Sequence, residues 1–529
     1  MTQSCEGKQV NDIAALRDSL PPLPDLRAAV QLALIFATVK LSVHIFANWL
    51  APHLGYGLFR DELYFIDCGR RLAWGYVDQA PMVALQARVA EILFGHSLIG
   101  LRLFSAMAGS ATVFLTGMLV WALAGPPVAQ AIGMTAVLFS PFYLAFGDYL
   151  SMNSFEPVFW MTIALVAIML ARGANPRWWL IIGLACGLGI ENKQDIVFFM
   201  AALLTGLLVS PQRKLLVNRW VLVAIAITVV IALPNLIWQI RNDWPTWQFL
   251  RNPQRPIIHH HFLGFVLQQL LFMNITWMLA GVGLLWLLFS TPARKFRFLA
   301  FGYILFFFLM FALHASTYYL GPHYPILIAA GAIAWEASTR NRRWALVAVV
   351  SLMVAYDVIY IPMSIPLQRP AAFLRYRNAV MRFTNPFSQA DDETIGQWYS
   401  DKIGWPEMVR DVAEAYDSLP PNEQARTAIL SQFYGDASAI DILGARYGLP
   451  NAVSGNQNFW LWGPRGYDGE YVIAVGYSRD EIPNVFGSVQ QVGQVYSRYA
   501  TAYENRPIFL CKDMYPPLRQ YWPHLKNWR

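Results

Sequence analysis

Apolar segments of membrane-spanning length fill the first 363 residues of this chain and limit what it can fold into. They lie at about 28–50, 98–122, 127–146, 155–171, 178–191, 195–210, 219–238, 262–289, 297–314, 322–338 and 344–363. An α-helix needs about 20 apolar residues to cross a hydrocarbon core of about 30 Å, and it satisfies its own backbone hydrogen bonds inside lipid. The segments therefore predict a polytopic α-helical membrane protein with about 11 transmembrane helices.

The charges support this class and exclude another. Only 14% of the 529 residues are charged, whereas a soluble chain has roughly a quarter. The formal net charge is +7, but the Lys and Arg residues lie in short loops between the apolar segments. A nucleic-acid-binding protein needs a basic cluster on one domain face, so we expect no nucleic-acid partner.

The fifth and sixth apolar segments are short, and the polar stretch ENKQD at 191–195 separates them. One helix through both would have about 32 residues and be ~48 Å long, which exceeds the bilayer core. With two separate passes, every second loop is basic, as in the cytoplasmic loops of membrane proteins. These loops hold Arg172 and Arg177, then Arg213, Lys214 and Arg219, then Arg294, Lys295 and Arg297, and then Arg340, Arg342 and Arg343. We therefore predict a cytoplasmic leader at 1–26 and a carboxyl terminus on the outer face.

This topology places the long polar loop 51–97 outside. Residues 60–82 of this loop read RDELYFIDCGRRLAWGYVDQAPM, with Asp61 and Glu62 adjacent. Amphipathic spacing at 61–73 and 82–94 predicts two helices that lie on the membrane surface. A carboxylate pair in a semi-buried, aromatic-lined loop can have its pKa tuned for base catalysis. The alternative is a solvated loop with ordinary surface ion pairs.

Other polar residues of the outer loops also have two interpretations. Lys193 lies between two short spans, where its ammonium group can meet a lipid phosphate or extend to water. Glu156 lies at the start of the fourth span, where a carboxylate can act in catalysis or cap the helix. The three histidines at 259–261 do not converge on one centre, and the four cysteines have no C-x-x-C spacing. We therefore predict no metal site.

Beyond residue 364 the chain changes character. Charges, Pro and Gly become more frequent, strand-like runs appear at 427–430, 471–475 and 507–510, and a helix-like segment lies at 437–447. This pattern predicts a soluble α/β domain over 364–529 on the outer face, following a transmembrane domain over 27–363.

The outer segments together resemble the membrane glycosyltransferases of the GT-C class. Among these they are most similar to the protein O-mannosyltransferase-like superfamily, which includes the bacterial lipid A aminoarabinose transferases. The resemblance runs through most of the chain and rests on RDELYF (60–65), GYVDQAPMVAL (75–85), YLSMNSFEPVFW (149–160), ENKQDIVFF (191–199), LPNLIWQIRNDWPTWQFLRN (233–252), TYYLGPHYPILIAAGA (317–332) and SGNQNFWLWGP (454–464).

The resemblance implies an inverting transfer of a sugar from a polyprenyl-phosphate-linked donor to a hydroxyl of a lipid, glycan or protein acceptor. The reaction would take place on the outer face of the bacterial inner membrane, in the 27–363 domain. The same resemblance makes Asp61 the candidate general base, Glu62 its support and Glu156 a second acid. It implies that substrates are bound by Tyr64, Asp78, Gln79, Arg102, Asn153, Asn192, Lys193, Tyr318, Tyr319, His323 and Tyr324. No cofactor is required if cations hold the donor phosphate, although some relatives use a divalent ion.

This chain departs from the family pattern at two positions. Gln79 and Gln194 stand where the commoner D-H-P-P and N-K-H patterns have histidine, which puts the sugar or acceptor preference in question. Two other functions fit the same spans. A transporter or lipid flippase is disfavoured because the halves show no inverted repeat and the polar residues gather on one face. A non-catalytic scaffold for the outer domain would tolerate replacement of Asp61.

Overall fold

The computed structural model describes residues 20–252, 261–384, 394–500 and 505–528, so the predicted leader lies almost entirely outside the described residues. In the described ranges, six helices are long and apolar enough to cross a membrane. They are α2 (Leu26–Leu54), α5 (Leu98–Ala122), α8 (Met152–Ala171), α11 (Arg219–Arg241), α15 (Arg297–Ala312, with the 3₁₀ turn before it) and α17 (Arg343–Ser364). The prediction of a polytopic helical membrane protein is confirmed.

Two further pairs of helices are apolar and sharply bent. The axes of α6 (Pro127–Phe139) and α7 (Pro141–Gly147) differ by 60°, and those of α13 (Phe262–Met273) and α14 (Thr276–Phe289) differ by 117°. Counting each pair as one span gives up to eight candidate spans in the described residues. The helices α9 (Trp179–Asn192), α10 (Ile196–Leu208) and α16 (Tyr324–Thr339) are shorter. Each predicted apolar segment is therefore helical, and eleven crossings remain a prediction.

Two helices from the loop 51–97 lie between the bundle and the carboxyl-terminal domain, here called the outer domain after its predicted side of the membrane. We call the segment that holds Asp61 and Glu62 the D-E loop. The first, α3 (Arg60–Arg70), starts with acidic residues in its first turn, and its Glu62 carboxylate accepts the Phe59 N–H at 2.8 Å. The second, α4 (Pro81–Phe94), starts with proline, which suits the first helical position. They touch closely at Gly69, where a Cβ would lie 2.8 Å from the Ala84 carbonyl oxygen. The two predicted surface helices are thus present within a few residues of their expected bounds.

The carboxyl-terminal part forms a mixed five-stranded sheet in the order β2-β1-β3-β5-β4. The strands are β1 (Thr427–Ser431), β2 (Val453–Ser454), β3 (Tyr471–Val475), β4 (Phe486–Gln494) and β5 (Pro507–Met514). Both β2 and β3 run parallel to β1, whereas β5 is antiparallel to β3 and to β4. The helices are α20 (Trp405–Asp417), α21 (Pro421–Gln424), α22 (Tyr434–Leu443), α23 (Gln457–Trp462) and α24 (Leu518–Tyr521).

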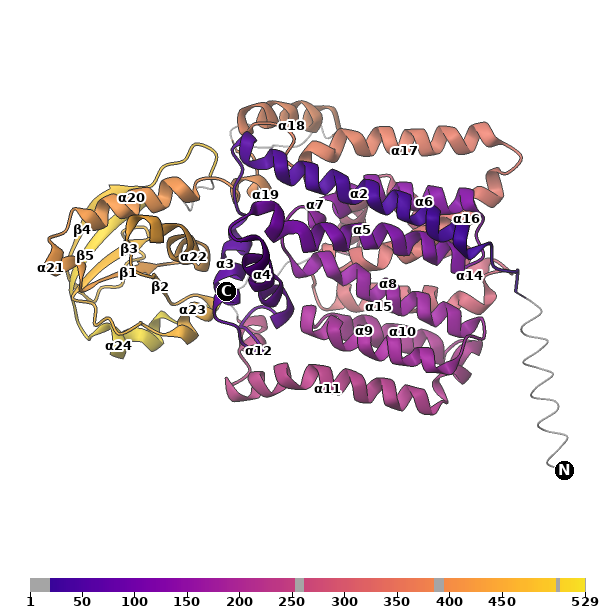
Figure 1. The fold of residues 1–529 in the computed structure, drawn as a ribbon, viewed down its shortest axis with the longest axis horizontal. Helices are drawn as coiled ribbons and strands as arrows, with labels where there is room; N and C mark the ends of the chain where they lie inside the picture. The colour runs from indigo at the N-terminus through magenta and orange to yellow at the C-terminus, as the bar shows by residue number, and fades with distance from the viewer. Residues whose placement is uncertain (1–19, 253–260, 385–393, 501–504, 529) are drawn as a thin grey trace.

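Alternate strand residues pack on opposite faces of this sheet, as the pleat requires. Ile429 and Ile473, which are neighbours in the β1–β3 register, belong to a hydrophobic cluster with α20 and α22. Leu430 and Val472 belong to a second cluster with α24. Figure 1 shows α20 and α24 on opposite sides of the sheet.

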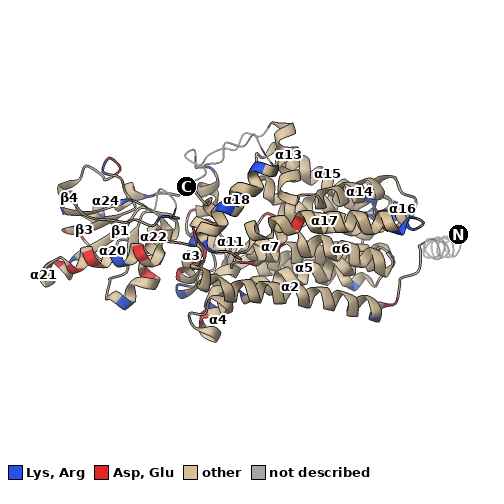
Figure 2. Cartoon of the chain, turned by 90° about the horizontal axis from the view of Figure 1, so that it is seen from above, with Lys and Arg blue, Asp and Glu red and all other residues tan. Residues whose placement is uncertain are grey.

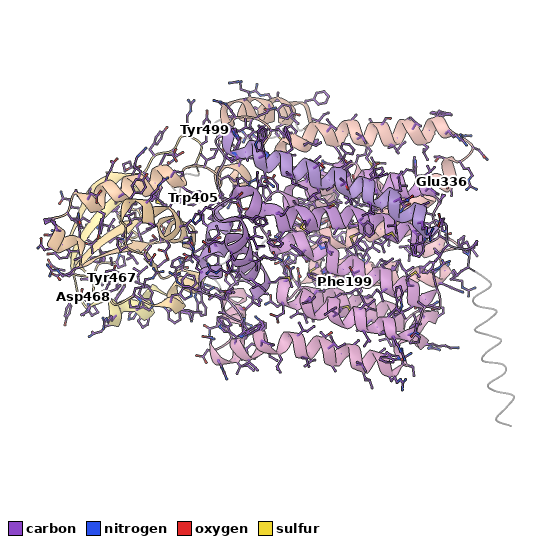
Figure 3. All side chains as sticks on the ribbon, in the orientation of Figure 1. Phe199, Glu336, Trp405, Tyr467, Asp468 and Tyr499 are labelled. Carbon is purple, nitrogen blue, oxygen red and sulfur yellow. The ribbon has the colours of Figure 1, made fainter. Side chains whose placement is uncertain are left out.

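The outer domain is packed tightly onto α3 and α4. Figure 1 shows these two helices between the sheet and the long helices, at the end of the bundle opposite the start of α2. The cluster that contains Ile429 also contains Leu63 and Tyr64 of α3, so one hydrophobic core crosses the junction. Trp405, labelled in Figure 3, lies at this junction. The connecting helices are α18 (Pro370–Thr384) and α19 (Gln397–Ser400).

Charges follow the same division. Figure 2 colours few residues along the length of the bundle as acidic or basic and more of them in the outer domain and at α3. The polar residues that could carry chemistry therefore meet where the outer domain contacts the bundle.

Candidate active site

Asp61 is the carboxylate of the D-E pair that reaches solvent. Its side chain is 31% exposed. The Tyr434 hydroxyl of α22 donates to Asp61 Oδ1 at 2.7 Å, and the Arg60 Nε donates to the same oxygen at 3.4 Å. An exposed carboxylate with one oxygen held in place suits a group that must accept a proton from a substrate.

Glu62 faces the opposite way and is fully buried. Both its oxygens accept from the Arg102 guanidinium at 2.8 Å, and the Phe59 and Leu150 N–H groups each donate to it at 2.8 Å. Arg102, also fully buried, further donates to the Asn48 side chain and the Gly57 carbonyl. This bidentate pair joins α3, α5 and the start of α8. It leaves neither Glu62 nor Arg102 open to a substrate, so we revise both expected roles to positioning.

Tyr64 and Asp78 form a second polar contact with the outer domain. The Tyr64 hydroxyl donates to Asp78 Oδ1 at 3.0 Å and accepts the Asn458 N–H at 3.3 Å. Burial raises the pKa of Tyr64 well above its usual value, and the nearby Asp78 adds to this effect. Asn458 Oδ1 in turn accepts the Val77 N–H at 3.1 Å. These contacts fix the loop between α3 and α4 against α23.

Gln79 is 2% exposed, and neither end of its amide has a hydrogen-bond partner among the described residues. An amide in this state has donors and an acceptor ready for a polar ligand or for water. The predicted substrate role of Gln79 fits this placement.

Lys193 lies at the break between α9 and α10, as the ENKQD stretch predicts. Its Nζ contacts Asn153 Oδ1 at 3.0 Å, Glu156 Oε2 at 2.9 Å and Asp195 Oδ2 at 2.8 Å. It also lies 4.1 Å from the centre of the Tyr319 ring. Burial alone would lower the pKa of Lys193, but Asp195 and Glu156 outweigh it and raise this pKa well above its usual value. The lysine is therefore a fixed cation.

The neighbours of Lys193 complete a small polar group. Tyr318 stacks on Tyr319 with a ring separation of 4.7 Å and lies 5.2 Å from the lysine ammonium. The Asn192 side-chain amide donates to the Met152 carbonyl at 2.8 Å, which ties the break to α8. A pocket adjoins this group and is lined by Asn153, Glu156 and Tyr318 together with the aromatic rings of Phe142 and Phe146.

Tyr149 connects this cationic group with Asp61. It lies in the turn between α7 and α8, 5% exposed. Burial raises the pKa of the Tyr149 hydroxyl, hydrogen bonds with the Ser151 and Asn153 side chains lower it, and the charge of Asp61 raises it. Tyr149 contacts Asn153, which itself binds Lys193, and its ring packs 5.0 Å from that of Phe59, two residues before Asp61. The candidate base and the fixed cation therefore lie on neighbouring segments.

Two predicted residues lie elsewhere. The ring of His323, 2% exposed, packs among Trp160, Phe199 and Tyr303 in the helical core, and Phe199 is labelled within the bundle in Figure 3. Tyr324 is 1% exposed and donates to the Gln269 side chain at 2.8 Å. The 3₁₀ segment Thr317–His323 directs these two side chains into the core while Tyr318 and Tyr319 face Lys193. Both side chains thus lie in the helical core, and the substrate roles predicted for His323 and Tyr324 stay predictions.

The outer domain brings residues to this site that have no role among the predicted site residues, although Asn458 lies in the segment 454–464 that carries the resemblance. Tyr434 and Asn458 lie 373 and 394 positions from their partners on α3. Lys402 forms an ion pair with Asp148 at 3.0 Å in which both side chains are fully buried. Their contacts cannot be inferred from local sequence, because these contacts depend on how the outer domain docks.

Metal-binding clusters are absent from the described ranges. These ranges contain no group of three or more His, Cys, Asp or Glu side chains that could hold a metal ion, while His259 and His260 lie outside them. Cys68 and Cys511, which could have paired on the outer face, are both free and buried. Independence from metal stays a prediction.

Comparison with known proteins gives a partial sequence match. Residues 78–238 match the family of dolichyl-phosphate-mannose-protein mannosyltransferases. An undecaprenyl phosphate-α-4-amino-4-deoxy-L-arabinose arabinosyl transferase of Pseudomonas fluorescens is 27% identical over 227 residues, which cover 40% of this chain and 37% of that relative. The lipid A galacturonosyltransferase RgtD of Rhizobium johnstonii is 27% identical over 213 residues, which cover 40% of this chain and 44% of that relative. The chain thus spans less than half the length of these relatives.

The structural match covers nearly the whole chain. The crystal structure of ArnT from Cupriavidus metallidurans bound to undecaprenyl phosphate aligns with a TM-score of 0.58 and 15% sequence identity. The alignment covers 90% of this chain and 97% of that one. At this identity the likeness establishes a common fold.

Proposed function

We propose a function from the premise that this chain resembles the lipid A aminoarabinose transferases of the GT-C class, a resemblance that the family match, the curated relatives and the shared fold confirm. The protein is an inverting glycosyltransferase that moves a sugar from a polyprenyl-phosphate-linked donor to an acceptor hydroxyl. The observation that carries the proposal is a partly exposed carboxylate, Asp61, beside the segment 149–153 that contacts the buried cation Lys193.

Each part of this site has a chemical role in the transfer. Asp61 takes the proton of the acceptor hydroxyl as its oxygen forms a bond to the anomeric carbon of the sugar. The bond between that carbon and the phosphate oxygen breaks, and the polyprenyl phosphate leaves with the electron pair. Lys193 holds a positive charge in a partly dry site, where electrostatic stabilisation is strong, and it would exchange its contact with Glu156 or Asp195 for one with the departing phosphate. A base and a cation on opposite sides of the anomeric carbon give inversion in one displacement.

The relatives suggest which molecules to test. Their names specify an undecaprenyl phosphate-linked aminoarabinose donor in one case and lipid A as a galacturonosyl acceptor in the other. We propose the same carrier class for this chain, with a lipid acceptor preferred over a glycan or protein. The site would face outward from the bacterial inner membrane, with the start of α2 on the cytoplasmic side. The matched relatives are transferases and give no support to a transporter.

Turnover in a reconstituted membrane tests the proposal. Purified protein in nanodiscs receives undecaprenyl phosphate-linked aminoarabinose or galacturonic acid with lipid A, and mass spectrometry follows the modified lipid. Wild type should transfer a sugar and Asp61→Asn should not. Asp417→Asn, at an exposed aspartate of the outer domain, controls for loss of charge. Equal turnover by wild type and Asp61→Asn, or no turnover by wild type beside an active transferase, would refute it.

A further inference from the structure

The candidate base is completed by the outer domain and not by the membrane part alone. We infer that Tyr434 is a positioning residue for the transfer reaction, because its hydroxyl holds Asp61 Oδ1 and directs Oδ2 towards the acceptor. This inference rests on the proposed function and adds to it a residue from a different domain.

The hydrogen bonds of Asp61 carry the first step. In the described part of the chain, the hydrogen bonds to its carboxylate, from Tyr434 at 2.7 Å and from Arg60 at 3.4 Å, both end on Oδ1. Within the described part of the chain, Oδ2 therefore keeps its lone pairs for a substrate. A short bond to an ionised oxygen is among the stronger hydrogen bonds in proteins, and it restricts the rotation that an exposed aspartate otherwise has.

The second step is that Tyr434 is itself held in place. Its ring packs 4.8 Å from the Tyr64 ring, and the Arg60 guanidinium lies 5.5 Å from its centre. Its backbone N–H donates to Asn456 Oδ1 at 3.0 Å. The next residue, Gly435, allows a close approach, because a Cβ there would lie 2.5 Å from Arg60 Cγ. A hydroxyl fixed from several sides can orient a partner at little entropic cost.

Several other charged or titratable groups surround this carboxylate. Arg60 and Glu62 lie on the same helix, Tyr149 faces it from the turn before α8, and Asp401 contacts the far side of the Arg60 guanidinium at 3.4 Å. Glu62 is fully engaged by Arg102, and Arg60 bridges to Asp401. Among these groups, Tyr434 makes the shortest contact with Asp61, so its removal should have a distinct effect.

Tyr434→Phe tests the inference, since it deletes the hydroxyl and keeps the ring. We expect kcat to fall about 10- to 100-fold, which corresponds to the loss of one hydrogen bond to a charged group. The KM values for donor and acceptor and the thermal unfolding midpoint should stay within error, because the ring contacts remain. Tyr416→Phe is the matched control: it deletes a hydroxyl that donates to the Gln424 carbonyl inside the same domain, away from α3.

The outcomes separate this inference from the proposed function. Activity in wild type and its loss in Asp61→Asn establish the transferase first. If Tyr434→Phe then keeps wild-type kcat, the inference fails and the transferase stands. If kcat, KM and the unfolding midpoint all change together, Tyr434 serves docking of the outer domain and the positioning role is refuted.

Discussion

Glu62→Gln should destabilise this protein, whereas the neighbouring Asp61→Asn should inactivate it without unfolding. The two residues are adjacent in sequence and have opposite surroundings. Glu62 is fully buried and receives four hydrogen bonds at 2.8 Å, while the Asp61 side chain is 31% exposed. Amide substitution at Glu62 therefore breaks a buried ion pair, whereas the same substitution at Asp61 removes a partly exposed proton acceptor.

The size of the Glu62 effect follows from its partners. Each carboxylate oxygen accepts from one Arg102 nitrogen and one backbone N–H. A glutamine NH₂ in place of either oxygen faces two donors and leaves Arg102 as a buried charge without a counterion. Breaking a buried pair in this way costs about 3–5 kcal/mol. Glu62→Gln combined with Arg102→Met should recover part of this loss, because no unpaired charge remains.

Thermal unfolding in detergent, followed by tryptophan fluorescence, measures the effect. We expect the apparent midpoint of Glu62→Gln to fall by about 5 °C or more, with that of Asp61→Asn close to wild type. Sugar transfer is then measured for variants that remain folded. An unchanged midpoint in Glu62→Gln together with loss of transfer would refute this reasoning and make Glu62 the base.

Three further predictions concern other parts of the site. Lys193→Arg keeps the charge, but the larger guanidinium group does not fit among oxygens that lie 2.8–3.0 Å from the lysine Nζ. We therefore expect kcat to fall at least about tenfold, and wild-type turnover would contradict this. Gly75→Ala places a Cβ 2.4 Å from the Trp238 ring, which should shift the loop that carries Asp78 and raise KM. Gly264→Ala is the control, because a Cβ at Gly264 meets no atom within 4 Å. Equal KM values for the two variants would contradict this prediction. Burial raises the pKa of Asp436 to about 7, against the opposing charges of Arg60 and Arg506, so wild type should lose stability as pH rises from about 4 to 7. Asp436→Asn should remove that loss, so it should melt higher than wild type at pH 8, by a smaller margin at pH 5 and by none near pH 4; parallel curves would contradict it.

The sequence could predict whatever depends on local pattern. Apolar length gave the helices, amphipathic spacing gave α3 and α4, and the polar break gave the place of Lys193 between α9 and α10. Strands β1, β3 and β5 lie where alternating apolar runs predicted them, whereas the partly exposed β4 lacks such a run. The site was harder to predict, because Asp61 and Glu62 are equivalent in sequence and differ only in what packs around them.

The placements that the sequence did not indicate have the same physical origin. His323 and Tyr324 follow two tyrosines that do face Lys193, and only the path of the 3₁₀ turn separates the pairs. Arg102, expected among the substrate-binding residues, has its counterion 40 positions away. Side-chain direction and long-range pairing are properties of the folded chain, and a single sequence does not specify them locally.

The long separation between Asp61 and Tyr434 also bears on how the protein is made. A chain grows from its amino terminus, and its early parts fold first. The bundle and α3 can thus be inserted in the membrane well before residue 434 leaves the ribosome. Until the last third of the polypeptide has folded onto α3, the hydroxyl that holds the Asp61 carboxylate is missing. Under the proposed function, a prematurely terminated chain would transfer sugar more slowly than the 529-residue chain.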